Sequence, residues 1–409
     1  MNIDSGDTAW MLASAALVLF MTPGLAMFYG GMVRGKNVLS TMMQSFFAMG
    51  LVSILWALLG YTIAFGSTAG PLGQFVGGLQ FVFLNGVDNA VNPLAPTIPA
   101  SVFSMYQGMF AIITVGLITG AIAERMKFSA YVVFGGAWAL LVYSPLAHWV
   151  WGGGWLQQMG ALDFAGGTVV HIASAAAALA AAIVLGKRKG YGTEELHPHN
   201  LTLTLLGAGI LWFGWFGFNA GSALSAGTLA GSAFLATNLA AAAGMLGWLT
   251  VERAATGSAT TLGAASGAVA GLVGITPAAG FVGPMPAIAI GLAAGVLCYF
   301  GLRMKTRFGF DDALDVVGIH GVGGVTGAIL TGVFASTTIN AAGRNGALFG
   351  NPTQLAIQIV GVVATIAFSF GVSFAILKVI EATMGIRVSE DVEERGLDLG
   401  EHAETAYTL

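Results

Sequence analysis

Two histidines inside long apolar stretches are the residues of this chain with the clearest capacity for chemistry. His171 and His320 both lie in runs rich in glycine and alanine. An ionisable side chain inside a membrane span is costly and is a functional candidate by default. Neutral imidazole donates and accepts hydrogen bonds and can relay a proton. The pair therefore predicts a pore for a small molecule that is a cation in water and neutral inside. The alternative for each ring is a histidine satisfied by a neighbouring helix.

The depths of the two histidines in their helices are similar. His171 precedes the end of its run near Leu185 by about 14 residues, or roughly 21 Å of helix. His320 precedes the end of its run near Val333 by about 13 residues, or roughly 20 Å. If the two helices cross the membrane in opposite directions, both rings lie near its middle. We therefore expect the two imidazoles to approach each other.

Aromatic residues gather where several apolar runs begin or end. Trp151 follows one run, and Tyr106 and Phe110 lie one helical turn apart at the start of another. Ser222 ends the aromatic segment 212–222. An aromatic face attracts a cation by roughly 0.5–2 kcal/mol, and a serine hydroxyl can accept a hydrogen bond from an N–H group. These residues predict a cation-recruiting site, and the alternative is an aromatic belt at the membrane interface.

Two aspartates lie close to the histidine-bearing runs. Asp163 precedes the run of His171, and Asp315 precedes the run of His320. Each carboxylate could cap the helix that follows it or bind the cation directly. Capping is favoured because a bare carboxylate would hold a cation too tightly to release it.

The composition requires a membrane. Of the 409 residues, 56% are hydrophobic and only 8% are charged, whereas a soluble domain carries about 25% charged residues. The 61 glycines lie largely inside apolar runs, and the spacing of Gly263, Gly267 and Gly271 predicts close helix contact. The single cysteine excludes an intrachain disulfide and a cysteine-based metal site. There is no Walker loop and no HExxH motif, so we expect no ATP-driven step, no enzyme activity, no metal and no cofactor.

The apolar runs give an all-α membrane protein with eleven transmembrane helices. A span needs about 20 mostly apolar residues. The runs lie near 8–31, 40–65, 101–123, 129–148, 167–186, 201–220, 229–251, 259–277, 285–302, 314–334 and 353–380. The odd number predicts two inverted five-helix halves plus one extra helix, an arrangement that commonly encloses a site at the midplane.

Basic residues orient the spans. Cytoplasmic loops collect lysine and arginine, and the exits of the even-numbered spans carry only Arg344. All the others follow odd-numbered spans: Arg34, Lys36, Arg125, Lys127, Lys187, Arg188, Lys189, Arg253, Arg303, Lys305, Arg307, Lys378, Arg387 and Arg395. This alternation predicts that the N-terminus lies outside and the C-terminus inside.

The C-terminal segment differs from the rest of the chain. Residues 1–383 are expected to form the transmembrane domain, and residues 384–409 a cytoplasmic acidic tail. Seven carboxylates against two arginines give this tail a formal charge of −5. Composition alone favours a solvated tail without a task.

Four segments together resemble the ammonium transporter family (Amt/Mep/Rh), on its bacterial Amt branch, and the match runs nearly end to end. The segments are FYGG at 28–31, DFAGGTVVH at 163–171, GWFGFNAG at 214–221 and the aspartates and histidine between 311 and 321. The resemblance implies ammonium transport and assigns roles to individual residues. Trp151, Tyr106, Phe110, Ser222 and Asp163 match the outer recruitment site, Phe110 and Phe218 match stacked gate rings, and His171, His320 and Trp215 match the pore.

The resemblance also implies partners. The family is trimeric, with one pore in each subunit, and members with such a tail are blocked by a trimeric PII-type signalling protein in the cytoplasm. The tail around Arg395 and Asp398 is similar to that regulatory tail. One departure is Tyr106, where the family commonly has phenylalanine. Its hydroxyl leaves the aromatic face in place but adds a polar group to the outer site.

We therefore expect a multi-pass protein of the plasma or inner membrane that takes up ammonium as a nitrogen source and binds no nucleic acid. NH4+ is recruited outside and deprotonated, NH3 passes the hydrophobic gate, and the proton moves separately, so that transport is electrogenic. Three alternatives remain open: an ammonium sensor that signals through its tail, a haem-binding electron carrier with His171 and His320 as axial ligands, and a neutral gas or water pore.

Overall fold

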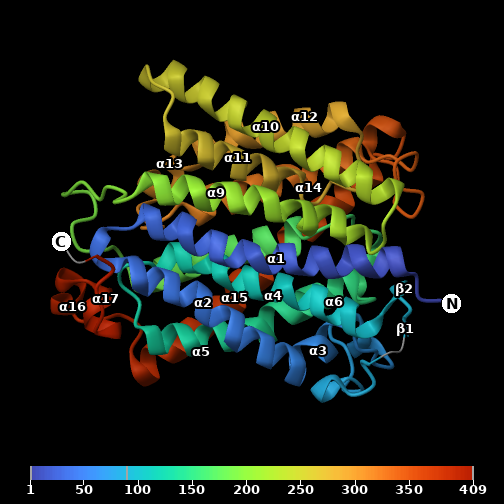
Figure 1. Ribbon diagram of the computed structural model, residues 1–409, viewed down its shortest axis with the longest axis horizontal. Helices are drawn as coiled ribbons and strands as arrows, with labels where there is room; N and C mark the ends of the chain where they lie inside the picture. Colours follow the sequence, from blue (N-terminus) through green and yellow to red (C-terminus); the bar gives the residue numbers. More distant parts are fainter. Residues whose placement is uncertain (1, 89–90, 408–409) are drawn as a thin grey trace.

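Long helices run side by side along the longest dimension of the molecule in the computed structural model, which describes residues 2–88 and 91–407 (Figure 1). The two ends of the chain lie at opposite ends of this bundle (Figure 1). We call these ends the N-terminal side and the tail side. Helices within residues 201–334 occupy one flank, whereas the long helix of residues 353–384 lies with helices of the first half on the other flank; the first helix lies between the two flanks (Figure 1).

The chain forms helices that alternate with short connections. The first half contains α1 (Ser5–Met32), η1 (Gly35–Asn37), α2 (Val38–Leu55), η2 (Trp56–Gly60), α3 (Tyr61–Phe65), η3 (Pro71–Gln74), η4 (Val82–Leu84), α4 (Ala100–Ile122), α5 (Phe128–Trp138), η5 (Ala139–Tyr143), α6 (Ser144–Trp151), α7 (Trp155–Met159), η6 (Gly167–Ile172) and α8 (Ala173–Leu185). The second half contains α9 (Leu201–Trp215), η7 (Phe216–Ala220), η8 (Gly221–Ala223), α10 (Thr228–Thr256), α11 (Thr261–Ile275), α12 (Pro284–Gly301), α13 (Arg303–Phe308), η9 (Val317–Gly321), α14 (Val322–Phe334), η10 (Ala347–Phe349), α15 (Thr353–Met384), α16 (Glu390–Arg395) and α17 (Leu397–His402).

Ten helical segments of the described chain are long and apolar enough to cross a membrane. Each coincides with one of the eleven spans expected from the sequence. The expected eighth span, 259–277, contains α11, which is apolar but has only 15 residues, or about 22 Å of helix. The count of eleven therefore stays a prediction. A small antiparallel hairpin of β1 (Val91–Asn92) and β2 (Ala95–Pro99) also departs from an all-α chain.

Glycines bring α10, α11 and α12 into direct backbone contact. A Cβ atom on Gly271 would lie 2.2 Å from the carbonyl oxygen of Ala240, and one on Gly267 would lie 2.5 Å from Cβ of Trp248. Both distances are too short for any larger side chain. The close contact predicted from the four-residue glycine spacing is therefore confirmed.

The acidic tail is packed against the tail side of the bundle. The backbone N–H of Leu397 donates to Oδ1 of Asn37 at 2.9 Å, and the backbone N–H of Ser40 donates to Oδ1 of Asp398 at 2.8 Å. Glu393 is 1% exposed and pairs with Arg387 at 2.7 Å. Composition favoured a solvated tail, but these residues are packed against the bundle because Asn37, Ser40 and Lys189, all far away in sequence, bond to them.

Buried ion pairs join the two halves on the tail side. Arg188 binds Asp311 at 2.9 Å and Glu124 at 3.2 Å, and Arg34 binds Glu124 at 2.9 Å. Burial would raise the pKa of Glu124, but the nearby Arg188 and Arg34 outweigh it and hold that pKa below its usual value. The network fixes the loops that precede and follow the histidine-bearing helices.

Candidate functional site

An aromatic vestibule opens on the N-terminal side of the bundle. Its volume is about 180 Å³. The vestibule is lined by Phe65, Leu94, Phe103, Gln107, Phe110, Trp151, Gln157, Phe164, Ser222 and Leu224. Three of the predicted recruitment residues, Trp151, Phe110 and Ser222, thus meet in one hollow from α6, α4 and η8. The indole N–H of Trp151 donates to the carbonyl of Asp163 at 2.8 Å, which fixes the ring plane at the wall.

Tyr106 lies behind this wall rather than in it. Its side chain is 1% exposed, and its hydroxyl lies 2.9 Å from the carbonyl oxygen of Gly217, 3.0 Å from that of Phe218 and 3.2 Å from Oγ of Ser222. Ser222 in turn lies 2.8 Å from the carbonyl of Phe218. Each hydroxyl has one hydrogen, and both hydrogens have acceptors inside the protein. Ser222 is therefore left with a lone pair that can accept a hydrogen bond.

Two phenylalanine rings close the floor of the vestibule. The ring centroids of Phe110 and Phe218 lie 4.2 Å apart with the planes tilted by 31°. Phe110 also meets Trp151 edge to face at 6.2 Å. Both phenylalanines are 1% exposed, so the rings form an apolar seal between the vestibule and the interior.

The two histidines meet below this seal. Nδ1 of His171 lies 3.1 Å from Nδ1 of His320, and the rings are stacked with centroids 5.2 Å apart. One Nδ1 donates and the other accepts, so two neutral rings must hold different tautomers. Nε2 of His171 is buried without a hydrogen-bond partner among the described residues. This nitrogen is free to bond to a small molecule placed beside it.

The space beside the histidines is narrow and apolar. Its volume is about 10 Å³, which is about what one water-sized molecule needs. It is lined by Met21, Leu25, Phe28, Ile113, Leu117, Val170, His171, Leu211, Trp215, Phe218, Val269 and His320. The ring of Trp215 stacks on that of His171 with centroids 5.5 Å apart, and its indole N–H donates to Oγ1 of Thr276 at 2.9 Å. The predicted pore residues thus line one cavity.

The histidines lie on two helices that begin at opposite sides of the bundle with π-helical turns. η6 carries His171 and starts at Asp163 on the N-terminal side, whereas η9 carries His320 and starts beside the ion pairs of the tail side. A π-helical turn widens the backbone spacing and is frequent at functional sites. Phe218 also lies in a π-helical turn, η7, while two further turns of this kind in the described chain, η2 and η5, carry none of the predicted site residues.

The carboxylate of Asp163 is occupied by the start of η6. Oδ1 accepts hydrogen bonds from the N–H groups of Gly166 and Gly167 at 2.8 and 2.7 Å, and Oδ2 accepts from the N–H and the hydroxyl of Thr168. Five donors in all, including the N–H of Val169 at 3.3 Å, surround the two oxygens. This geometry is that of a helix cap, and the carbonyl oxygen of Asp163 accepts the hydrogen bond from Trp151 at the vestibule wall.

On the other helix the cap is not Asp315. Oδ2 of Asp312 accepts from the N–H of Val317 at 2.7 Å, whereas Asp315 has a φ of +63° and pairs with Lys305 at 2.6 Å. The sequence analysis considered Asp315 as the cap because Asp315 lies nearer than Asp312 to the run of His320. No residue pattern distinguishes the two aspartates, since the distinction depends on the turn between them.

Sequence reasoning missed several lining residues. Gln107 lines the vestibule, and Phe28 lines the cavity beside the histidines. Gln107 could have been predicted from the sequence, because it is a polar residue inside an apolar run and lies next to Tyr106. Thr276, which holds Trp215, gave none because a threonine at the end of a helix is common.

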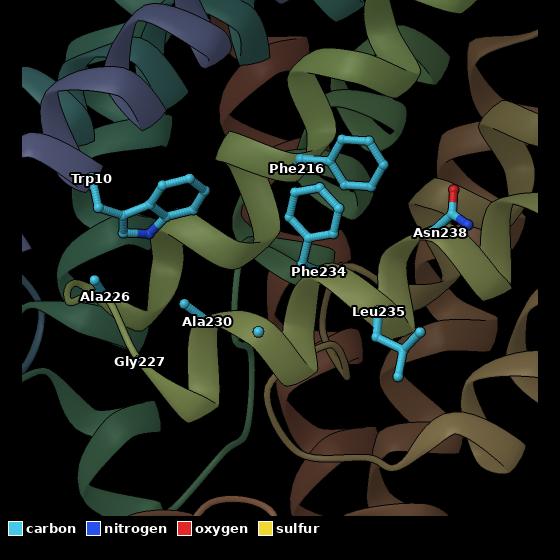
Figure 2. A pocket seen from close by; sticks show the side chains of 9 residues that line it. Trp10, Phe216, Ala226, Gly227, Ala230, Phe234, Leu235 and Asn238 are labelled. Carbon is cyan, nitrogen blue, oxygen red and sulfur yellow. The ribbon is translucent and has the colours of Figure 1, made fainter.

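A larger surface pocket lies away from this site. It has a volume of about 630 Å³ and is almost wholly apolar, between α1, η7 and α10. Figure 2 shows the ring of Phe216 facing that of Phe234, with Trp10 and Asn238 at opposite ends. No histidine or charged residue lines it, and across the described chain no group of three or more His, Cys, Asp or Glu could hold a metal ion.

Comparisons with known proteins agree over almost the whole chain. A model of the Ammonium Transporter Family matches residues 9–407. An ammonium transporter of Bacillus subtilis (strain 168) is 53% identical over 403 residues, which cover 98% of each chain. Among solved structures, Mep2 of Candida albicans is 38% identical with a TM-score of 0.89, covering 95% of this chain and 87% of that one. A protein described as a sensor Amt protein is 30% identical with a TM-score of 0.89, covering 97% and 98%.

Proposed function

This chain belongs to the ammonium transporter family and is a multi-pass integral protein of the cell membrane, and from that premise we propose the route by which it transports ammonium. NH4+ binds in the vestibule against the faces of Trp151 and Phe110 and donates a hydrogen bond to Oγ of Ser222. It then loses a proton, and NH3 passes the Phe110–Phe218 seal into the pore.

The observation that carries this proposal is the contact between the two imidazoles. If Nδ1 of His171 donates to Nδ1 of His320, then Nε2 of His171 holds a lone pair toward the pore. A proton accepted at Nε2 can release the Nδ1 proton to His320, which then gives up its own Nε2 proton. The relay moves one charge without any ion crossing the apolar cavity, so transport is electrogenic and K+ is excluded.

The direct test is current on a solid-supported membrane. The purified full chain is reconstituted in liposomes and exposed to a jump in ammonium concentration, with an equal jump in K+ as the control. A saturable inward-positive current with ammonium alone is expected. A rise in internal pH without current would show that NH3 crosses unaccompanied and would remove the proton relay.

The orientation and assembly belong to the same proposal. The N-terminal side faces outward and the tail side faces the cytoplasm, because the basic loops lie on the tail side. The chain forms a homotrimer, as the sequence resemblance implies, and the apolar pocket between α1, η7 and α10 is a surface that a neighbouring subunit would cover (Figure 2). Light scattering of the detergent-solubilised protein should give three chains per particle.

The tail, residues 384–409, forms a separate regulatory segment in this proposal. Its outer surface carries exposed carboxylates, including Glu390 and Glu394, while its inner surface binds the loops of Asn37 and Lys189 on the tail side. We propose that a PII-type protein docks here. A PII-type trimer of the same organism, added to the inner face of the liposomes, should reduce the ammonium current.

A sensor is the second candidate, because one structural neighbour is described as a sensor Amt protein and the tail is ordered against the bundle. In a sensor, ammonium binding would change the tail while flux stays small. A chain ending at residue 383 that carries full ammonium current would argue against this function.

A further inference from the structure

An apolar groove lies behind the histidine pair, on the face of the bundle next to α15. Its volume is about 280 Å³. Residues from η6, α8, α13, η9, α14 and α15 line it: Ile172, Ala175, Ala176, Leu179, Met304, Val317, Gly321, Val322, Val325, Thr326 and Ile366. None of these residues has a role in the proposed transport route.

The floor of the groove adjoins the pore. Ile172 follows His171 in the chain, and Gly321 follows His320. The two backbones approach closely here, since a Cβ atom on Gly321 would lie 3.2 Å from Cβ of Ala175. Ala175, Ala176 and Gly321 have small side chains or none, so they leave room for a molecule in the groove. A molecule in it would press against the backs of both π-helical turns that carry the histidines.

The groove runs from the middle of the bundle toward the tail side. Near mid-membrane, Ile172 packs with Ala328 and Val362, and Val325 covers that cluster. Met304, on the short helix α13, marks the opposite end at the tail side. A groove that extends from Ile172 to Met304 suits an elongated apolar molecule lying along the helices.

Lipid is the neighbour of this groove. On α15, Ile359, Val363 and Ile366 are 46%, 59% and 41% exposed, and their spacing puts them on one helix face. In a membrane-spanning helix, an exposed apolar stripe at this depth faces acyl chains. Ile366 belongs both to the stripe and to the groove, so the two surfaces are continuous.

Water is a poor occupant. Thr326 is the only polar side chain in the lining, and its hydroxyl already donates to the carbonyl of Val322 at 2.7 Å. A buried water needs two to four polar partners. We propose that the groove binds one acyl chain of a phospholipid from the tail-side leaflet, with the end of the chain against Ile172. The bound chain supports η6 and η9 from behind.

Photo-crosslinking tests the site directly. The full chain is reconstituted in phosphatidylcholine vesicles that contain a small fraction of phosphatidylcholine with a diazirine at the end of one acyl chain. After irradiation, peptide mass spectrometry should find labels on Ile172 and Val325, whereas a diazirine near the glycerol should mark Met304. Val363 on the open lipid face serves as the internal control and should be labelled by the probes whatever the groove contains.

Filling the groove should displace the lipid. Ala176→Phe places a ring in the groove and should reduce labelling of Val325 at least about fivefold, with labelling of Val363 unchanged. Val133→Phe, on the exposed face of α5 outside the groove, is the matched control. If Ala176→Phe does not assemble, Leu179→Trp fills the rim instead.

Two results would overturn the proposal. Labelling of Val363 with none in the groove would mean that the groove is covered, for example by a neighbouring subunit. Equal labelling of Val325 in wild type and the filled variants would mean general lipid contact without a bound chain. The inference depends only on the membrane location, so loss of the labels with normal ammonium current would leave the transport proposal intact.

Discussion

Nδ1 of His171 lies 3.1 Å from Nδ1 of His320 in a cavity that is otherwise apolar. Only one hydrogen fits between the two nitrogens. The tautomer of one ring therefore sets the tautomer of the other. In the relay that we propose, a proton that enters at one Nε2 leaves at the other, and the pair alternates between two tautomeric states.

Removing both imidazoles should end selective transport. A chain with His171→Ala and His320→Ala has no group in the cavity to accept the proton, so we expect the ammonium current to fall by about 100-fold or more. The exposed histidine in His197→Ala is the matched control and should leave the current unchanged. Wild-type ammonium current with K+ still excluded in the double variant would refute the relay.

The seal formed by Phe110 and Phe218 should control water entry. Phe218→Leu removes part of the ring that stacks on Phe110 at 4.2 Å, so we expect higher water permeability in stopped-flow light scattering of proteoliposomes. Phe234→Leu is the control, because Phe234 stacks on Phe216 in the surface pocket away from the pore (Figure 2). Equal permeability in the two variants would mean that the rings do not form the barrier.

The histidine contact could be anticipated from sequence because its causes are local. Each histidine interrupts an apolar run, each run is long enough to cross a membrane, and the alternation of basic loops makes the two runs antiparallel. These three observations place both rings near the same depth. The ring stacking and the choice of Nδ1 as the contacting atom depend on the π-helical turns, which have no residue signature.

The tail shows the limit of composition. Seven carboxylates predicted solvation, yet Glu393 and Asp398 are 1% and 3% exposed. Asp398 accepts a hydrogen bond from the backbone of Ser40, more than 350 residues earlier in the chain. The pattern of charges along a sequence cannot predict this contact, because the donor is a backbone N–H group and lies far away in the chain.

Substitutions of Tyr106 and Ser222 should have different effects on the half-saturating ammonium concentration. Tyr106→Phe keeps the ring but removes the hydroxyl that bonds to the carbonyls of Gly217 and Phe218. We expect a loss of about 1 kcal/mol in the free energy of unfolding and a half-saturating ammonium concentration within about threefold of wild type. Ser222→Ala removes the acceptor itself and should raise that concentration by about tenfold, or 1.4 kcal/mol. Current measured over a range of ammonium concentrations distinguishes the two, and a larger shift for Tyr106→Phe would place its hydroxyl in contact with the cation.

Asp163 should act on folding rather than on cation affinity. Asp163→Asn replaces one acceptor oxygen by a donor NH2 group that faces backbone N–H groups of η6. Losing charge-assisted bonds costs about 1.5–3 kcal/mol each, so we expect a lower melting temperature in detergent and less folded protein. Molecules that do fold should keep the wild-type half-saturating ammonium concentration. A stable variant with sharply weakened ammonium binding would instead assign Asp163 to the cation.

The buried pairs on the tail side predict the response to acid. Arg188 and Arg34 hold the pKa of Glu124 below its usual value of 4.5 in spite of burial. A carboxyl with a lowered folded pKa contributes stability that is complete above its unfolded pKa and is lost as the pH falls through the folded pKa. We therefore expect a constant melting temperature from neutral pH to about 5 and a decline below about 4.5.

Glu124→Gln should reduce the free energy of unfolding at neutral pH by about 2–3 kcal/mol and so lower the melting temperature there. The variant should also lose less stability in acid, so that its melting temperature approaches that of wild type at low pH. Glu390→Gln, at an exposed carboxyl of the tail, should follow wild type. If the curves of wild type and Glu124→Gln stay parallel down to low pH, the network does not stabilise the fold through this charge.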